Sequence, residues 1–325
     1  MKLHISTLCI LATTVVVINT STVAQEAKPA KPKATSPSEA SIVWVNELPP
    51  HKQLPPNTTH RTFESKLAGQ NVGYCIYLPP NYNVNEDRRY PVIYNLHGNG
   101  GNTEFHSFED VQVLHDGIVS GKWPPMIMAL PNGGTSTFYK DSYDGKFPIE
   151  SILITELIPH IDQEFRTIAS GSGRCIEGFS MGGRGSLRLA MKYPEMFCSL
   201  FCQAGNVPAT LENFDNAESW HDVIGGYLGP DRANYEANDA FVLLEKNLKQ
   251  IRGKLRIQIA CGTKDGGHLP TIRSFHEHLV EHNVDHTYIE LEGLAHNRTE
   301  MIKRLEPIWF DYHVESLRQA GAIEP

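Results

Sequence analysis

The sequence predicts an α/β protein with a doubly wound, mostly parallel sheet and an N-terminal antiparallel hairpin. Three observations lead to this prediction. Short apolar runs typical of buried strands alternate along the chain with segments of helical periodicity. The run at 90–96 is nearly continuously apolar, as a strand covered on both faces is. Glycine-rich turns such as Asn132-Gly133-Gly134 follow the runs, and helices that alternate with buried strands imply right-handed crossovers in a parallel sheet.

The elements can be placed in chain order. Residues 62–67 and 72–78 are strand-like runs around Ala68-Gly69-Gln70-Asn71, which predicts the hairpin. The later strands are expected at 90–96, 125–130, 175–177, 198–203, 255–260 and 286–291. The helices are expected at 105–120, 149–165 with a kink at Pro159, 186–192, 240–248, 269–282 and 298–318. Residues 206–253 show no strand signal and are expected to form a long excursion near the functional site.

The chain is expected to begin with a secretory signal peptide at residues 1–24. Lys2 is followed by an apolar run at 9–18, and Thr22-Val23-Ala24 gives a small-residue cleavage site before Gln25. The run is too short to span a bilayer. Residues 25–41 are rich in Ala, Lys, Pro and Ser without apolar periodicity, so we expect a disordered spacer. Residues 42–325 are long enough for one α/β domain.

Charge and cysteine usage limit the partners and the compartment. The net charge is -8 and the pI is about 6.0, with no basic run outside the spacer, so nucleic acid is not an expected partner. No later apolar run reaches bilayer length, so no membrane span is expected, and the leader predicts a secreted or periplasmic protein. Most of the cysteines after residue 24 lie in apolar strands, which favours buried reduced thiols.

The sequence around Ser180 carries the strongest chemical signal. An apolar strand ends in Gly178-Phe179-Ser180-Met181-Gly182, and helical residues follow. In such a nucleophile elbow, the glycines leave room for a turn that exposes the serine hydroxyl above a sheet. The alternative is a glycine-rich turn with an ordinary solvent-exposed serine.

A serine hydroxyl needs a base within hydrogen-bond reach and a carboxylate that orients the base. The carboxyl ends of parallel strands open on one edge of a sheet, and three such ends carry Ser180, Asp265 and His296. Their chain order is the one found in α/β-hydrolases. Asp285 precedes its strand and should lie at the opposite edge. His268 follows the same strand as Asp265, and we expect it to be a substrate contact or a solvated loop residue.

An acyl-transfer site also needs N–H donors for the oxyanion. The amide after the nucleophile belongs to Met181, and the turn His97-Gly98-Asn99-Gly100-Gly101 favours Asn99 as the second donor. The alternative for this segment is a plain tight turn. Together, these residues predict a serine hydrolase that uses no metal or other cofactor.

With these pieces in place, the chain resembles the α/β-hydrolase-fold esterases that include feruloyl, acetylxylan and enterochelin esterases, S-formylglutathione hydrolase and the mycolyltransferases. The likeness covers about 62–309, and the resemblance implies the same triad and the same two oxyanion amides. Two departures concern the substrate: Asn297-Arg298-Thr299 stands where members often have a tryptophan shortly after the histidine, and Glu177 occupies an often apolar strand position. We expect Glu177 to be a paired structural carboxylate or to tune the site. The motifs that carry the likeness are Tyr77-Leu78-Pro79-Pro80-Asn81-Tyr82, Tyr90-Pro91-Val92-Ile93-Tyr94-Asn95-Leu96-His97-Gly98, Met128-Ala129-Leu130-Pro131-Asn132-Gly133, Glu156-Leu157-Ile158-Pro159-His160-Ile161 and Gly178-Phe179-Ser180-Met181-Gly182-Gly183.

Other candidate residues can be read in two ways. Trp220 and Tyr227 would suit stacking on a sugar or an aryl ring, or they could simply pack the 206–253 segment onto the domain. His278 and His282 have the i,i+4 spacing of metal ligands. The apolar stripe of their helix lies elsewhere, at Ile272, Phe275 and Leu279, so a solvated face is the expectation.

The function expected from the sequence is that of an exported serine carboxylesterase acting through an acyl-enzyme. The expected substrates are small-molecule or carbohydrate esters with short or aromatic acyl groups. Two alternatives remain: an acyltransferase with the same triad, and a carbohydrate-binding or scaffold protein with a silent site.

Overall fold

The structure is a computed structural model that describes residues 42–84, 87–100, 103–219, 221, 223 and 226–324. The expected signal peptide at 1–24 and the expected spacer at 25–41 lie outside the described residues.

One eight-stranded sheet forms the centre of the described chain, with strand order β1-β2-β4-β3-β5-β6-β7-β8. β1 pairs antiparallel with β2, and β2 pairs antiparallel with β4, whereas all later pairings are parallel. The expected hairpin and the mostly parallel sheet are therefore confirmed. The strands are β1 Thr58–Ser65, β2 Gln70–Tyr77, β3 Val92–Leu96, β4 Ile127–Pro131, β5 Arg174–Phe179, β6 Ser199–Gln203, β7 Arg256–Gly262 and β8 His286–Leu291.

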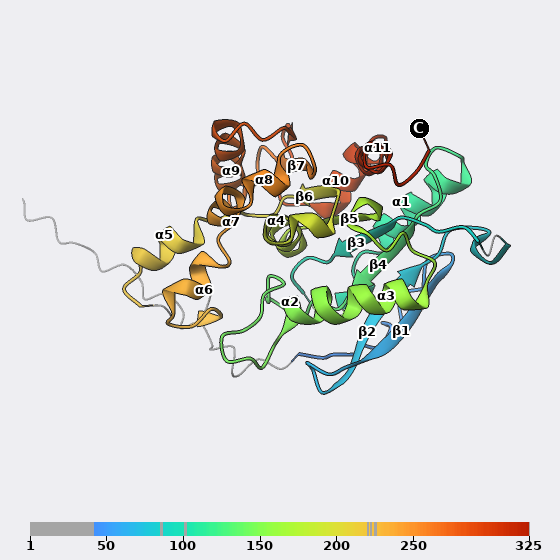
Figure 1. Cartoon of the computed structure of the whole chain (residues 1–325), viewed down its shortest axis with the longest axis horizontal. Coiled ribbons are helices and arrows are strands. Elements are labelled where there is room, and N and C mark those ends of the chain that lie inside the picture. The colour runs from blue at the N-terminus through green and yellow to red at the C-terminus, as the bar shows by residue number, and fades with distance from the viewer. Residues whose placement is uncertain are drawn as a thin grey trace, which may run out of the picture. The chain divides into compact units, whose positions relative to one another are not determined.

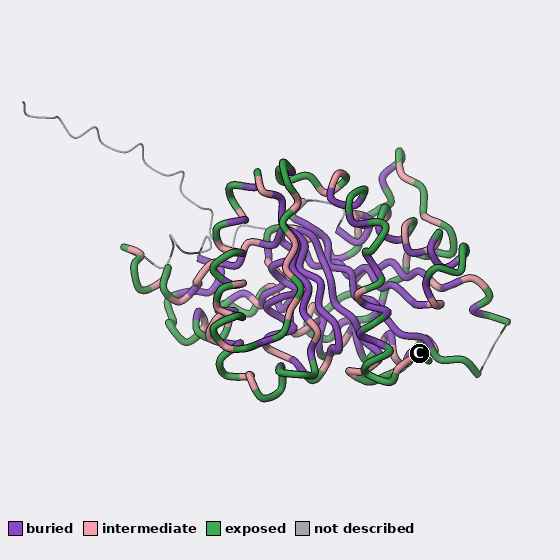
Figure 2. The backbone as a smooth tube through the Cα atoms, turned by 90° about the horizontal axis from the view of Figure 1, so that it is seen from above, coloured by how far each residue is buried: buried purple, intermediate pink, exposed green. Residues whose placement is uncertain are grey.

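Helices cover both faces of this sheet, and Figure 2 shows the buried strands as a central layer with coils of chain on either side. Every residue of β3, β4, β5 and β6 is buried, as their apolar sequences require. Figure 1 shows the arrangement of the helices: α1 Phe108–Val119, α2 Ile149–Ser151, α3 Ile158–Glu164, α4 Met181–Lys192, α5 Thr210–Asp215, α6 Arg232–Glu236, α7 Ala240–Lys246, α8 Leu248–Ile251, α9 Leu269–Glu281, α10 Arg298–Leu305 and α11 Asp311–Gln319.

The helix expected at 149–165 is present but not uniform. A π-helical segment, Ile152–Leu157, joins α2 to α3, and the N–H of Ile158 donates to the carbonyl of Leu153. Pro159 follows directly, at the start of α3. Proline lacks an N–H and its ring collides with the carbonyl four residues earlier, so the wider π turn lets the helix continue through Pro159.

The single helix expected at 298–318 was wrong. The structure has two helices there, α10 and α11, because Pro307 lies between them and has no N–H to donate to the carbonyl of Lys303. The break turns α11 so that the indole of Trp123 donates to Asp311 Oδ1 at 2.6 Å.

The five cysteines in the described residues are all buried and free of disulfides, so the expectation of reduced, core-packed thiols is confirmed. Burial raises the pKa of Cys202 to about 12, which leaves an inert thiol. Among the described helices, none has both the length and the apolar character needed to cross a membrane.

Candidate active site

Ser180 occupies a strained turn between β5 and α4. Its backbone angles are φ 57° and ψ −117°, a region that residues with a Cβ rarely adopt. The N–H of Ser180 donates to the carbonyl of Gln203 at 2.8 Å, which fixes the turn against β6. A Cβ on Gly182 would overlap the backbone of Leu96, so the approach of α4 to β3 requires a glycine there.

Three side chains from three loops form a continuous hydrogen-bond chain at the carboxyl edge of the sheet. His296 Nε2 lies 2.9 Å from Ser180 Oγ, and His296 Nδ1 lies 2.6 Å from Asp265 Oδ2. Asp265 follows β7 and is buried, whereas His296 follows β8 and has a side chain that is 33% exposed. The buried carboxylate therefore fixes an imidazole that solvent can still reach.

A second histidine shares the same carboxylate. His268 Nδ1 donates to Asp265 Oδ1 at 2.8 Å. Its ring is stacked on that of His296, with centroids 4.1 Å apart and planes inclined by 6°. Phe179 also stacks on His296, at 4.7 Å. His268 thus contacts both Asp265 and His296. Of the two roles expected for it, that of a solvated loop residue does not fit these contacts.

The segments that carry the two expected oxyanion donors lie beside the serine. Met181 is the first residue of α4, where the backbone N–H has no partner within the helix. The β3 exit loop is equally close, because a Cβ on Gly98 would lie 3.7 Å from the Cβ of Ser180. The side chain of Asn99 is held by Ser136: its Oδ1 accepts from Ser136 N at 3.1 Å and from Ser136 Oγ at 2.8 Å. These bonds use only the acceptor of the side-chain amide, so the backbone N–H is one of the donors that Asn99 can offer an oxyanion.

His97 fastens this loop to the exit of β4. Its Nδ1 donates to the carbonyl of Gly98 at 2.7 Å, and its Nε2 accepts from the N–H of Gly133 at 3.0 Å. Burial lowers the pKa of His97 to about 4, so the ring is neutral and keeps this donor and acceptor pattern at neutral pH. The hydroxyl of Tyr139 also donates to the carbonyl of His97, at 3.2 Å.

Sequence reasoning missed the segment 135–139, which braces the Asn99 loop. Ser136, Phe138 and Tyr139 all have positive φ, between 52° and 56°. The Tyr139 ring fits because Gly133 and Gly185 have no Cβ. Glycine-rich turns were visible at 133–134, but nothing in the later residues indicates left-handed backbone.

Glu177 is a fully buried carboxylate with several donors around it. It accepts from Asn95 Nδ2 at 2.8 Å, from Trp309 Nε1 at 2.8 Å and from His313 Nε2 at 3.3 Å. Its side chain is directed into the core network rather than to Ser180, which matches the structural alternative expected for it. Arg298 belongs to the Asn297-Arg298-Thr299 segment, which stands where family members often have a tryptophan. Its guanidinium donates to Asp110 Oδ1 at 2.5 Å.

Of the two aromatic candidates for substrate stacking, Trp220 lies outside the described residues. Tyr227 is 7% exposed, clusters with Val223 and Tyr235, and donates its hydroxyl to the carbonyl of Lys140 at 3.0 Å. This placement corresponds to the packing alternative and leaves little of the Tyr227 ring available to a sugar.

Two groups of described side chains could share a metal ion. One consists of Asp265, His268 and His296, and the other of Glu245, His278 and His282. The second group lies outside the active site. The expectation that His278 lies on a solvated face of its helix was wrong. Its side chain is only 14% exposed, because it packs against Phe241 of α7.

Comparisons with known proteins place the chain in one family. The model of the Esterase family matches residues 65–307. An esterase of Mycobacterium tuberculosis is 35% identical over 177 residues, which are 53% of this chain and 37% of the relative. An endo-1,4-beta-xylanase/feruloyl esterase of Xylanibacter ruminicola is 36% identical over 149 residues, 43% of this chain and 20% of the relative. The chain thus spans well under two thirds of these curated relatives.

Solved structures share the fold. A ferulic acid esterase superposes with a TM-score of 0.65 at 22% identity, covering 81% of this chain and 100% of that chain. An S-formylglutathione hydrolase from Agrobacterium tumefaciens gives a TM-score of 0.62 at 21% identity and covers 80% of this chain and 95% of that chain. The predicted α/β-hydrolase fold is therefore confirmed.

Proposed function

Because this chain belongs to the Esterase family, we propose that it is a serine carboxylic ester hydrolase with Ser180 as nucleophile, His296 as general base and Asp265 as the orienting acid. The observation that carries the proposal is the unbroken hydrogen-bond chain from Ser180 Oγ through His296 to Asp265, on the edge of the sheet where ligands bind.

The proposed reaction proceeds in two half-reactions. Ser180 Oγ attacks the ester carbonyl carbon while its proton passes to His296 Nε2. The N–H groups of Asn99 and Met181 stabilise the negative oxygen of the tetrahedral intermediate. His296 then returns the proton to the leaving alkoxide, and an acyl-Ser180 ester remains. In the second half-reaction, a water attacks that ester, again through His296, which releases the acid and restores the serine.

Asp265 supports both steps by holding His296 in one tautomer. The Nδ1–H donates to the carboxylate, so Nε2 presents a lone pair to the serine, and the negative charge stabilises the imidazolium that forms. His268 limits the rotation of Asp265 by donating to its other oxygen. In this proposal, His268 is a positioning residue rather than a second base.

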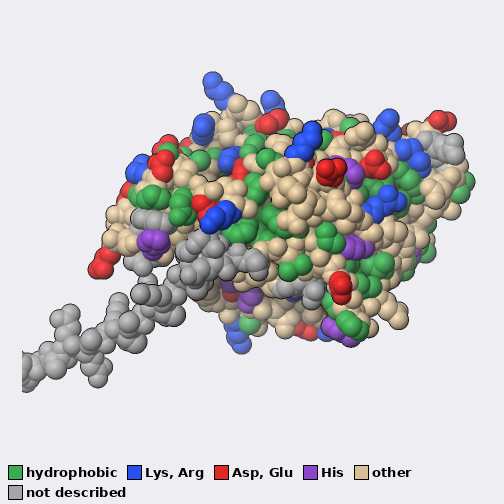
Figure 3. Space-filling view, turned by 90° about the horizontal axis from the view of Figure 1, so that it is seen from below, with side chains coloured by type: hydrophobic (Ala, Val, Ile, Leu, Met, Phe, Trp, Pro, Cys, Tyr) green, Lys and Arg blue, Asp and Glu red, His purple; other side chains and the backbone are tan. Residues whose placement is uncertain are grey.

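The proposed substrates are carbohydrate or small-molecule esters with short or aromatic acyl groups. The support is the resemblance to carbohydrate esterases and the match to a curated relative named as a xylanase/feruloyl esterase. No nucleic-acid partner is proposed, since the net charge is -8 and acidic and basic side chains are interspersed on the face in Figure 3. Export to the periplasm or the medium is proposed from the sequence of residues 1–24 alone.

The proposal is tested first by labelling with a fluorophosphonate probe, which reacts with activated serines. The wild-type protein should be labelled, and Ser180→Ala should not. Ser274→Ala, an exposed serine on α9, is the matched control and should be labelled normally. Ester hydrolysis by Ser180→Ala should fall by a factor on the order of 10⁴ to 10⁶. Full activity in Ser180→Ala would refute the assignment.

Substrate class is tested by comparing acetyl, feruloyl and palmitoyl esters with a peptide amide. Fastest turnover of palmitoyl esters would contradict the carbohydrate-ester proposal. An acyltransferase would pass the acyl group to an added sugar alcohol in preference to water, so the ratio of the two products separates transfer from hydrolysis. A silent binding protein would show neither the label nor either product.

A further inference from the structure

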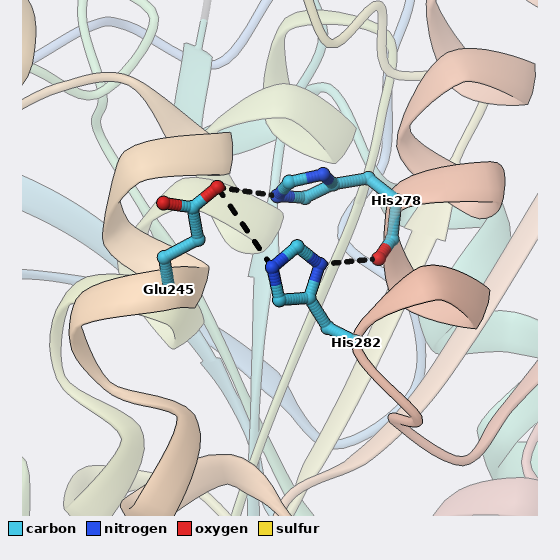
Figure 4. A group of neighbouring side chains, drawn as sticks. All are labelled: Glu245, His278 and His282. Carbon is cyan, nitrogen blue, oxygen red and sulfur yellow. Dashed lines mark hydrogen bonds and ion pairs between the residues drawn. The ribbon is translucent and has the colours of Figure 1, made fainter.

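A cluster of potential metal ligands lies between the C-terminal end of α9 and α7. His278, in the last turn of α9, and His282, just after it, direct their rings toward Glu245 of α7, as Figure 4 shows. His282 follows His268 by 14 residues, and helical rise places it about 20 Å along the axis from the active-site end of α9. The cluster is therefore separate from the triad.

The spacing of the three side chains suits a small cation. Glu245 Oε1 lies 3.4 Å from His278 Nε2 and 3.9 Å from His282 Nε2, and the ligand atoms of all three residues lie within 4.8 Å of one another. Ligands about 2.0–2.1 Å from a common ion at tetrahedral angles are about 3.3 Å apart. Small side-chain rotations would therefore complete the coordination.

The hydrogen bonds around the cluster leave the correct nitrogen atoms available. His282 Nδ1 donates to the carbonyl of His278 at 2.9 Å, which leaves the lone pair of Nε2 directed toward Glu245. This is the outer hydrogen bond that metal-bound histidines usually make. His278 Nε2 is buried and has no well-formed hydrogen bond among the described residues. Both rings thus direct Nε2 toward the same carboxylate oxygen.

The charge of the cluster and its access to solvent also suit a cation. Glu245 supplies one negative charge and is 56% exposed, so an ion can enter from solvent. Phe241 and Phe275 pack around His278 and restrict its ring.

We propose that Glu245, His278 and His282 form a binding site for one divalent transition-metal ion, best matched by Zn²⁺, with solvent as the fourth ligand. Two imidazoles and one carboxylate are ligands that Zn²⁺ prefers. The ion would join α7, at the end of the 206–253 segment, to the last turn of α9. Its role is structural, because it lies away from the reacting atoms.

The other cluster of ligand atoms is a poorer site. In the Asp265–His268–His296 group, both Nδ1 atoms already donate to the carboxylate, at 2.8 and 2.6 Å. An ion there would have to break both hydrogen bonds and would inhibit the esterase. Whether the ion binds in the active site or at the Glu245–His278–His282 cluster can therefore be decided by measuring esterase activity as well as by mutation.

The test is calorimetric titration of the tag-free, EDTA-treated full-length protein with Zn²⁺ alone. The wild-type protein should bind one equivalent, and Glu245→Gln and His282→Ala should each weaken binding at least tenfold. His276→Ala, on the same helix but outside the cluster, should bind like the wild type. Zn²⁺ should raise the Tm of the wild type and of His276→Ala, and not that of His282→Ala.

The expected result includes retained esterase activity at one equivalent of Zn²⁺ and tetrahedral Co²⁺ absorption that is lost in His282→Ala. The proposal is overturned if no binding tighter than millimolar is found, or if both cluster variants bind like the wild type. It is equally overturned if His296→Ala, and not His282→Ala, removes the bound equivalent, since the ion would then lie in the triad.

Discussion

At the scale of single residues, the proposed chemistry depends on one carboxylate that serves two rings. Asp265 is 3% exposed, and each of its oxygens accepts from a different histidine. An asparagine in its place has only one acceptor oxygen, so it can keep one of the two hydrogen bonds, and it lacks the charge that stabilises an imidazolium. Position 265 therefore requires a carboxylate more strictly than a position where the acid has a single hydrogen-bond partner.

Asp265→Asn should reduce turnover of an acetyl or feruloyl ester by a factor on the order of 10⁴, the loss known for the equivalent change in a serine protease. Asp285 is the matched control, because it is exposed and precedes β8 at the opposite edge of the sheet. Asp285→Asn should leave kcat within about twofold of the wild type. Steady-state kinetics of the two purified variants checks this, and a larger loss at Asp285 would contradict the assignment of the acid.

At the scale of elements, the site depends on two loops that follow adjacent parallel strands. β3 pairs with β4, and His97 connects their exits through Gly98 and Gly133. Because the ring needs one donating and one accepting nitrogen, protonation would place an N–H against the N–H of Gly133. The loop that carries Asn99 is thus connected to His97, a buried histidine that is harder to protonate in the folded protein than in the unfolded chain.

This arrangement predicts a pH dependence of stability. The pKa of His97 is about 4 in the folded protein, against an ordinary value of 6.5, so between these values the unfolded chain binds more protons and stability falls as the pH falls. From pH 7.5 to pH 5, His97 should cost about 2 kcal/mol. Urea unfolding of His97→Gln should show a pH dependence smaller by that amount. His51→Gln, at an exposed site, should keep the wild-type dependence.

Most of the helices and strands could be predicted, because hydrophobic periodicity and turn-forming residues are local features of the sequence. β7 was expected at 255–260 and spans Arg256–Gly262, and the strand-end rule placed Ser180, Asp265 and His296 on the edge where the structure brings their side chains together. Tertiary effects could not be predicted. The place of the Tyr139 ring depends on space left by Gly133 and by Gly185, which is distant in sequence, and the burial of His278 depends on α7 packing over it. Pro307 was a local signal that the helical periodicity obscured.

At the scale of the whole molecule, one buried polar network joins the C-terminal helices to the centre of the sheet. Asn95 of β3 donates to Asp110 of α1 at 2.7 Å and to Glu177 of β5 at 2.8 Å. Arg298 of α10 pairs with Asp110, and Trp309 donates to Glu177. Since α10 begins two residues after His296, the network also anchors the loop that carries the base.

Glu177→Gln should test whether this network stabilises the fold rather than the chemistry. The carboxylate is 0% exposed and accepts on both oxygens: Oε1 from Asn95, and Oε2 from Trp309 and His313. The amide that replaces one oxygen must set its N–H groups against an existing donor, and a buried group left unsatisfied costs about 1–3 kcal/mol. Gln203 Nε2 also donates to Oε2, at 3.4 Å, and Gln203 contacts Ser180 through its backbone carbonyl, which the substitution leaves in place. We therefore expect that loss in urea unfolding, with kcat/KM at 25 °C within about threefold of the wild type, because Asn95, Trp309 and His313 have no hydrogen bond to Ser180 among the described residues. Glu292→Gln, at an exposed position, should change neither quantity. A hundredfold loss of activity in Glu177→Gln with unchanged stability would instead mean that Glu177 tunes the nucleophile.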